Sequence, residues 1–278
     1  MKKEISFKGY KFIIPENDRN FEKELMAVIA ILEKEVITET DKWTLIQSVP
    51  NSIHKTGKIA GAGSIDCSAS NCEFCRKMRK AAETDATIIC SLCYDYAQEQ
   101  YKINALNRHS LTMLILESVR FSREQLQTVQ FSFIERICSS GDTPNVVFAE
   151  NVIDMIDLHP YAHVAWWAKN TAAVITAVDK LGKPSNLKLV QSAIRIDKSE
   201  PLKKYFNYLF LVSATKEKVK EYTANGCCEC NGKKCQECGW KCYFGSWPDG
   251  SVIVEYLRCS KEKRQEIIAA IEKRDSVS

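Results

Sequence analysis

Long hydrophobic runs and histidines are both scarce in this 278-residue chain. No apolar stretch is long enough to cross a bilayer and no apolar signal segment stands at the start, so we expect a cytoplasmic protein without a membrane partner. The four histidines form no HExxH motif, which excludes the common helical zinc-hydrolase motif. Walker, dinucleotide-binding glycine and GxSxG motifs are absent too, so the common nucleotide-binding and serine-hydrolase classes are not indicated.

A strong excess of charge of one sign is also missing. The chain has 39 Lys and Arg against 35 Asp and Glu, a net charge of +4. This mild positive charge permits an anionic ligand but does not require nucleic acid. Hydrophobic residues at 45% and charged residues at 27% are the balance of an ordinary globular protein.

Cysteine, in contrast, is abundant. Eleven of the thirteen cysteines fall into two windows, residues 67–93 and 227–242. Disulfide scaffolds are typically short and secreted, and an odd cysteine count fits them poorly. The windows therefore predict thiolate ligation of a metal or an iron–sulfur cluster, with clustered buried thiols as the alternative interpretation.

Strand and helix patterns alternate from about residue 130 onward. Strands are expected over 129–137, 161–167, 187–193, 208–212 and 251–257. Helices are expected between them, one of which begins at Thr143 and Pro144, and others over 170–181, 215–224 and 260–274. This alternation predicts an α/β fold, a partial (β/α) barrel of TIM type with about six strands and cysteine-rich metal-binding insertions.

Three segments are expected along the chain. Residues 1–50 form a helical N-terminal segment around an amphipathic helix over 20–37. Residues 51–258 form the barrel-like domain, with a further helix over 94–121, and residues 259–278 form a C-terminal helix.

The first cysteine window contains two CxxC pairs. Two such pairs about fifteen residues apart have the spacing of a four-cysteine zinc site. Five thiols are one too many for that site, and three cysteines can hold a [4Fe–4S] cluster with one iron left open. The candidate ligands are Cys67, Cys72, Cys75, Cys90 and Cys93.

The second window packs six cysteines into sixteen residues, with Gly and Asn between them. A segment so short of regular structure would be ordered by its metal. Either a structural zinc ribbon or an auxiliary iron–sulfur cluster fits this spacing. The four expected ligands are Cys230, Cys235, Cys238 and Cys242.

Polar residues at the strand ends are the candidate binding residues, because ligands of parallel β/α folds bind there. Ser140, Gly141 and Asp142 lie where a strand leads into a helix, and Asp142 offers a carboxylate for an amine or hydroxyls. The alternative is that Asp142 caps the helix. Lys169 and Gln191 end other strands and are candidates for the same pocket.

The order of these motifs resembles that of the phage "gene product eighty-eight" family, also found in bacterial and mobile-element genomes. The resemblance covers roughly residues 50–258. It is carried by Asn51 and the Lys55-Thr56-Gly57-Lys58 segment, Cys67, Cys90-x-x-Cys93-Tyr94, the Arg-Ile-Cys-Ser-Ser-Gly-Asp turn that ends at Asp142, and Cys235-x-x-Cys238-Gly-Trp. Cys72, Cys75 and about fifteen neighbouring residues look inserted relative to the family, and Cys138 stands where the family usually has histidine.

The same order is distantly similar to radical S-adenosylmethionine (SAM) enzymes, in which a three-cysteine cluster follows the first strand of a partial barrel. That resemblance implies a [4Fe–4S] cluster on three of the first five cysteines, with SAM as a possible second cofactor. It gives Asp142 a contact with the SAM amine. Asp142 and Lys169 are therefore the candidate catalytic residues, and the strand-end residues Ser140, Gly141, Asp142 and Gln191 are the candidate cofactor-binding residues.

Two functions therefore stay open. The first is a radical-SAM-like iron–sulfur enzyme of unknown substrate. The second is a Zn²⁺-stabilised nucleic-acid-binding protein of phage or mobile-element origin. Four aromatic residues near the second window would stack bases in the second case, or pack around the metal loop: Trp240, Tyr243, Phe244 and Trp247.

Overall fold

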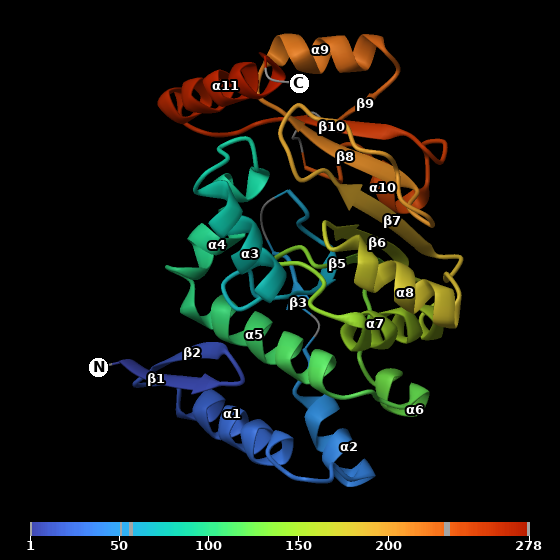
Figure 1. Ribbon diagram of the computed structural model, residues 1–278. Coiled ribbons are helices and arrows are strands. Elements are labelled where there is room, and N and C mark those ends of the chain that lie inside the picture. Colours follow the sequence, from blue (N-terminus) through green and yellow to red (C-terminus); the bar gives the residue numbers. More distant parts are fainter. Residues whose placement is uncertain (1, 51, 56–57, 231–233, 277–278) are drawn as a thin grey trace.

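Eight strands form one sheet in the computed structural model, which describes residues 2–50, 52–55, 58–230 and 234–276. Their order across the sheet is β3-β4-β5-β6-β7-β8-β10-β9 (Figure 1). The strands are β3 (Ser52–Ile53), β4 (Gly63–Ile65), β5 (Ile134–Ile137), β6 (His163–Ala168), β7 (Leu187–Ser192), β8 (Tyr208–Ser213), β9 (Cys228–Cys230) and β10 (Val252–Tyr256).

Only β3 runs antiparallel to its neighbour; every other neighbouring pair is parallel. From β3 to β8 the strand order follows the chain, as in a (β/α) barrel. The two outer strands, β3 and β9, do not pair with each other among the described residues, so the sheet is not a closed barrel. The prediction of an α/β fold built on a mostly parallel sheet is confirmed.

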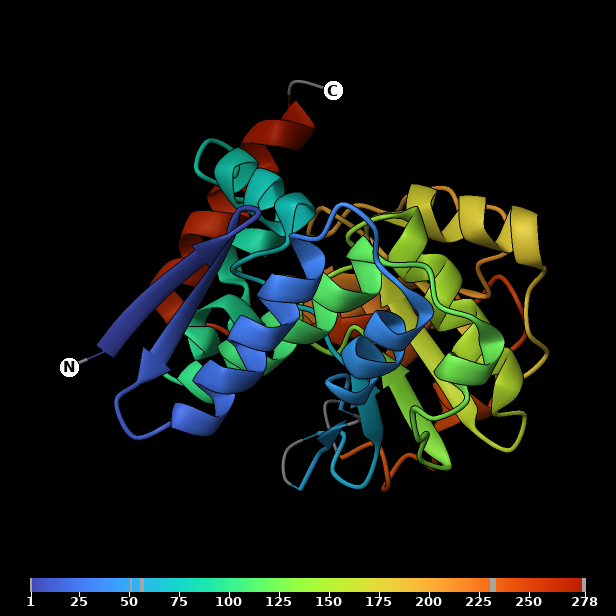
Figure 2. The same cartoon turned by 90° about the horizontal axis from the view of Figure 1, so that it is seen from below.

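The two faces of the sheet are covered by different parts of the chain. Side chains alternate between the faces along each strand, so Trp166 of β6 packs into the main core while Ala165 packs on the other face. The main core is covered by α5 (Ile103–Ser118), α7 (Val146–Leu158) and α8 (Thr171–Leu181), and Figure 2 shows α7 beside α8. The other face is covered by the second cysteine window, with Cys235, Cys242 and Tyr243 buried against it.

The first turn of α7 differs from the sequence-based expectation. The helix begins at Val146 and is capped by Asn145, whose side-chain oxygen accepts the N–H of Phe148 at 2.9 Å. Thr143, the expected cap, instead accepts the indole N–H of the buried Trp166 at 3.1 Å. The strand expected over 129–137 is likewise confined to β5, because residues 129–133 follow an irregular path to the sheet.

The N-terminal segment was expected to be helical, but only its second part is. It starts with a hairpin of β1 (Lys2–Phe7) and β2 (Tyr10–Pro15), followed by α1 (Arg19–Leu32) and α2 (Glu39–Gln47). Lys8 and Gly9 at the hairpin turn have φ of 47° and 80°. Two successive positive φ angles are typical of a type I′ turn, the twist-compatible connection of two strands.

Two asparagine side chains attach the hairpin to the rest of the molecule. Asn107 of α5 accepts the backbone N–H of Ile13 at 3.0 Å and donates to its carbonyl at 2.7 Å. Asn71 makes the same pair of bonds with Lys11, both at 3.0 Å. These amides act as the missing neighbouring strand for the free edge of β2, and α5 lies between the hairpin and the sheet (Figure 1).

The remaining helices follow the sheet strands or the first cysteine window. They are α3 (Glu73–Ala82), the 3₁₀ helix η1 (Ile89–Leu92), α4 (Tyr94–Glu99), α6 (Arg123–Leu126), α9 (Lys216–Ala224), α10 (Lys241–Phe244) and α11 (Lys261–Ser276). The expected helix over 94–121 is therefore divided into α4 and α5, whereas the expected C-terminal helix is present as α11. No helix within the described ranges is both long and apolar enough to span a membrane.

We predict that Asn107→Ala lowers the free energy of unfolding by about 1–3 kcal/mol, because it leaves the N–H and carbonyl of Ile13 without their partners. Chemical denaturation measures this change. Asn104→Ala on the same helix is the matched control, since Asn104 is exposed. Equal stabilities of the two variants would contradict the role of Asn107 as a strand substitute.

Candidate metal centre

The first cysteine window begins where β4 ends, beside the end of β5. The parallel pairing of these strands continues past their last residues, since Cys138 donates its N–H to the carbonyl of Ile65 at 2.9 Å. Cys67 in turn donates its N–H to the carbonyl of Ser140 at 3.1 Å. Two segments separated by seventy residues of chain are thereby held together at the carboxyl edge of the sheet.

Gly141 permits this close approach. Its φ is 70°, and a Cβ atom placed there would lie 2.5 Å from the carbonyl oxygen of Cys67 and 2.8 Å from the Cys67 Cβ. A side chain at position 141 would therefore displace the backbone that carries the first cysteine. The glycine predicted as a contact for a ligand instead makes room for Cys67.

Six thiols, not five, gather at this edge. Cys67, Cys72 and Cys138 are buried, whereas Cys75, Cys90 and Cys93 are partly exposed. The sulfur atoms of Cys67 and Cys138 lie 3.7 Å apart. Cys138 was missing from the candidate ligands, although its position directly after a strand and its place at the family's usual histidine were signals that could have included it.

Two of the thiols stand at helix starts. Cys72 precedes α3, and the Cys75 thiol together with the backbone N–H groups of Cys75 and Phe74 lowers the pKa of Cys72 despite burial. Cys93 precedes α4, and its sulfur accepts the N–H of Tyr96 at 3.4 Å. Backbone N–H groups favour the thiolate form, which is the form that binds metal.

Asp142 is the buried link between two strand ends. Its carboxylate accepts the backbone N–H groups of Thr143 at 2.8 Å, Lys169 at 3.0 Å and Asn170 at 3.3 Å. Only 1% of the residue is exposed, and burial raises its pKa while Lys169 and the three N–H donors oppose that rise. The residue does not cap α7; it ties the end of β5 to the segment between β6 and α8.

Lys169 supplies the positive charge among these groups. Burial alone would lower the pKa of its ammonium, but Asp142 and the thiols of Cys90, Cys75 and Cys93 raise it overall. The lysine therefore stays protonated next to three sulfur atoms, which suits it to neutralise thiolates.

Gln191 and Ser140, two further candidates, have different environments. Gln191 is buried and bonds to the chain between β7 and β8, donating to the carbonyl of Pro201 at 3.2 Å and accepting the N–H of Lys203 at 2.8 Å. The structure thus does not bring it to the thiols. The hydroxyl of Ser140 is buried and has no hydrogen-bond partner among the described residues, while its N–H binds Asp66 at 3.1 Å.

A group of carboxylates and imidazoles adjoins the thiols and was not identified from the sequence. Asp66 Oδ2 lies 3.7 Å from His109 Nε2 and 3.9 Å from His54 Nε2, and His109 Nδ1 lies 3.6 Å from Glu99 Oε1. Burial would lower the pKa of His109, but Glu99, Asp66 and Asp95 raise it overall. No motif links these residues, since four separate segments contribute them.

The second window brings together the four cysteines chosen from the sequence. Burial, followed by the nearby thiols of Cys230, Cys235 and Cys238, raises the pKa of Cys242 to about 12. The thiol of Cys238 lies 3.1 Å from the carbonyl of Cys235. Lys58 reaches this group, since its carbonyl accepts the N–H of Cys235 at 2.8 Å. Its ammonium pairs with Glu255 at 2.8 Å, and Glu255 followed by Cys230 raises its pKa in spite of burial.

The two remaining cysteines of that window, Cys227 and Cys228, have each other or Lys241 as their main charged neighbours. The structure does not describe residues 231–233, which lie between Cys230 and Cys235. Asn51, Thr56 and Gly57 of the family-like segment also lie outside the described residues.

The aromatic residues near the second window pack on one another rather than forming an open stacking surface. Tyr243 is buried, with its ring 5.3 Å from that of Trp240 and 5.7 Å from that of Trp167. The ring of Trp247 lies 6.0 Å from that of Tyr208, and only Phe244 is well exposed, beside His163. Packing around the metal loop is therefore the interpretation that the structure favours.

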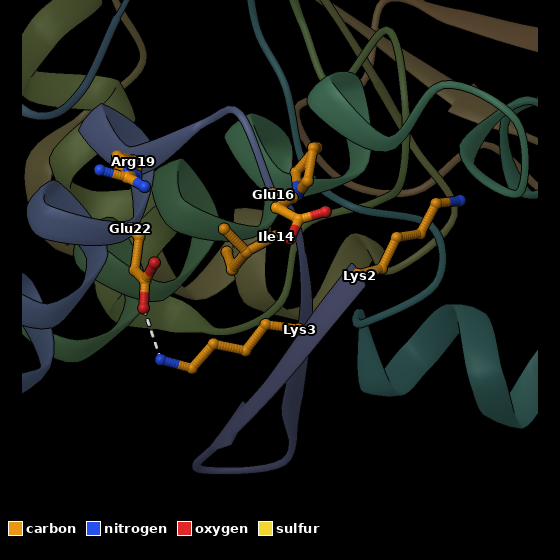
Figure 3. Close-up of a pocket in the computed structure, with 7 residues that line it drawn as sticks. Lys2, Lys3, Ile14, Glu16, Arg19 and Glu22 are labelled. Carbon is orange, nitrogen blue, oxygen red and sulfur yellow. Dashed lines mark hydrogen bonds and ion pairs between the residues drawn. The ribbon is translucent and has the colours of Figure 1, made fainter.

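Within the described ranges, no group of three or more His, Cys, Asp or Glu side chains is already arranged to hold a metal ion. A pocket of about 240 Å³ lies elsewhere, between the hairpin and α1, where Figure 3 shows Lys3 directed at Glu22. No protein-family model, curated protein or solved structure matches the chain. The likeness to the phage family and to radical SAM enzymes therefore stays a prediction.

We predict that Gly141→Ala destabilises the protein more than Gly9→Ala. Both glycines have positive φ, which costs alanine about 1–2 kcal/mol, but of the two only position 141 has a backbone atom within contact of the added methyl group. The clash with Cys67 adds about 1–3 kcal/mol of overpacking. Thermal and chemical denaturation of both variants measures the difference, and equal losses would show that Gly141 does not brace Cys67.

We predict that His109→Gln lowers stability more at about pH 5 than at about pH 9. A raised pKa means that the imidazolium stabilises the fold below the unfolded value of about 6.5, and that this contribution disappears as pH rises through the folded-state pKa. The difference in unfolding free energy between wild type and variant, measured at both pH values, isolates His109 from other groups. A difference that does not depend on pH would contradict the paired imidazolium.

Proposed function

We propose that this protein is an iron–sulfur protein whose principal cluster binds at the carboxyl edge of the sheet. The observation that carries the proposal is the meeting of six thiols with Asp142 and Lys169 where β4, β5 and β6 end. Ligand sites of parallel β/α folds occupy this edge. The order of cysteine loop, second strand and Ser140-Gly141-Asp142 supports a radical-SAM-like partial barrel.

The chemistry of the donor set fits a cluster or a metal ion. Thiolates bind iron and zinc, and the N–H groups at Cys72 and Cys93 favour the thiolate form. A buried group of several thiolates needs positive charge, which Lys169 supplies in part and the metal would complete. A bound cluster would supply one-electron transfer, while the chain supplies ligands, a charge-balancing lysine and a largely buried setting.

The residues fit SAM less well. The carboxylate expected to meet the SAM amine already accepts three backbone N–H groups and faces the ammonium of Lys169. Gln191 is bound to the chain beyond β7. We therefore assign Asp142 to positioning the strand ends, and the radical-SAM-like part of the proposal depends on the order of the elements alone.

A zinc-stabilised protein is the second candidate, and one distance favours it. Two thiolates on one Zn²⁺, each about 2.3 Å from the ion, lie roughly 3.8 Å apart in a tetrahedron. The sulfur atoms of Cys67 and Cys138 lie 3.7 Å apart. In this second proposal the protein binds nucleic acid, and its affinity must fall with increasing salt.

The second window is proposed as a structural or auxiliary metal site. Its four grouped cysteines cover one face of the sheet, against Ala165, Val190 and Tyr208. Metal bound there would order a segment with little regular structure and so keep these apolar side chains covered.

Metal analysis and visible spectroscopy of protein purified without oxygen test the proposal. We expect iron and acid-labile sulfide together with broad visible absorption from sulfur-to-iron charge transfer. Zinc without iron would overturn the iron–sulfur proposal and support the second candidate, which then requires salt-dependent binding to DNA or RNA. Protein without any bound metal would overturn both. Cys259→Ser, outside both windows, is the control and should leave the metal content unchanged.

A further inference from the structure

Cys138 follows β5 and lies outside both cysteine windows, yet its sulfur is the one that lies 3.7 Å from the sulfur of Cys67. We propose that Cys138 is a ligand of the metal centre that Cys67 also binds. This inference depends on the proposed function, in that it requires metal at the carboxyl edge of the sheet. It adds a sixth thiol to the ligands expected there. It also places the metal on the inner side of the site, where Cys67 and Cys138 are buried.

The backbone at Cys138 is held in an unusual conformation. Its φ is 53°, in the left-handed region that ordinary L-residues disfavour. The hydrogen bond from Cys138 to Ile65 fixes one side of this residue. The bonds from the Ser139 hydroxyl and the Ser140 N–H to Asp66 fix the other side. Strained positions held from both sides in this way are concentrated at functional sites, and here the held group is a thiol.

The surroundings of the inner thiols suit a cation. Cys67 and Cys138 are both buried, and the carboxylates of Asp66 and Asp142 lie near Cys138. Lys169 faces Cys75, Cys90 and Cys93 on the outer side of the site. A metal ion at the inner pair would bring positive charge to two buried sulfur atoms that have carboxylates beside them.

The proposed ligand set has four sulfur atoms, with Cys72 and Cys75 added to the inner pair. The Cys72 thiol lies near Cys67 and is hydrogen-bonded to the Cys75 thiol. Cys67, Cys72 and Cys75 come from the loop after β4, and Cys138 comes from the end of β5. With Cys138 as the fourth sulfur the protein itself closes the coordination shell, so an external ligand must displace a cysteine in order to bind.

The test compares Cys138→Ser and Cys138→His with the wild-type chain, each purified with its metal. Histidine can bind metal through nitrogen, whereas serine is a poor ligand for zinc or iron. X-ray absorption at the edge of the bound metal counts sulfur and nitrogen neighbours. We expect Cys138→His to keep the metal and to exchange one sulfur neighbour for nitrogen, a change that a purely structural role would not produce.

We expect Cys138→Ser to weaken metal binding by more than roughly 10-fold in a chelator competition, since even loss of a group that only orients a ligand costs that much. Circular dichroism checks that both variants are folded. Cys259→Ser and Cys259→His are the matched controls, because Cys259 is partly buried and lies after β10, outside the proposed site. They should retain the wild-type affinity and sulfur count.

The outcomes test the role of Cys138 separately from the proposed function. Metal in the wild-type chain, with an unchanged sulfur shell in Cys138→His, overturns the role of Cys138 and leaves the proposed function intact. Unchanged affinity in a folded Cys138→Ser does the same. Absence of metal from the wild-type chain overturns the proposed function and this inference together.

Discussion

The site depends most on the buried carboxylate of Asp142. A carboxylate this deeply buried costs free energy unless its oxygens are satisfied, and here three backbone N–H groups and one ammonium satisfy them. Those donors belong to the ends of β5 and β6, so the carboxylate fixes the two strand ends relative to each other. Gly141, next to it, lets the loop after β4 approach to contact distance. The positions of Cys67, Cys138 and Lys169 all follow from this arrangement.

The two cysteine windows each have a lysine nearby but lie at different places on the sheet. Each has a lysine near its thiols, Lys169 at the first window and, at the second, Lys58, whose ammonium is paired with Glu255. Arg136 of β5 lies between them, its guanidinium 4.0 Å above the ring of Trp167 and its pKa raised by Tyr243, Cys235 and Asp95 in spite of burial. The first window lies at the edge where parallel sheets bind ligands, whereas the second covers apolar side chains on one face of the sheet.

The helices and strands could be predicted from the sequence more accurately than the contacts between them. Apolar runs and Gly182 located α8 and the strands on either side of it, because burial on both faces leaves a continuous signal. The spacing of Cys230, Cys235, Cys238 and Cys242 predicted a metal site; the first three thiols lie near that of Cys242, but no group in the described part of the chain is arranged to hold a metal. The hairpin was missed because its Lys8-Gly9 turn is a weak signal. The Asp66, His54 and His109 group has no local pattern, since it forms only when three distant segments pack.

The inner thiols, Cys67 and Cys138, and the outer thiols, Cys90 and Cys93, therefore lie in different surroundings. Burial and nearby carboxylates keep Cys67 and Cys138 protonated in the absence of a cation, while Lys169 favours the thiolates of Cys90 and Cys93 on the partly exposed side. A metal that binds the inner thiols must displace their protons, which ties its affinity to pH and to the fold that holds Cys138 in place. Burial raises the pKa of Cys90 and Cys93 as well, although Lys169 opposes that rise, so a metal that binds the outer thiols must also displace protons.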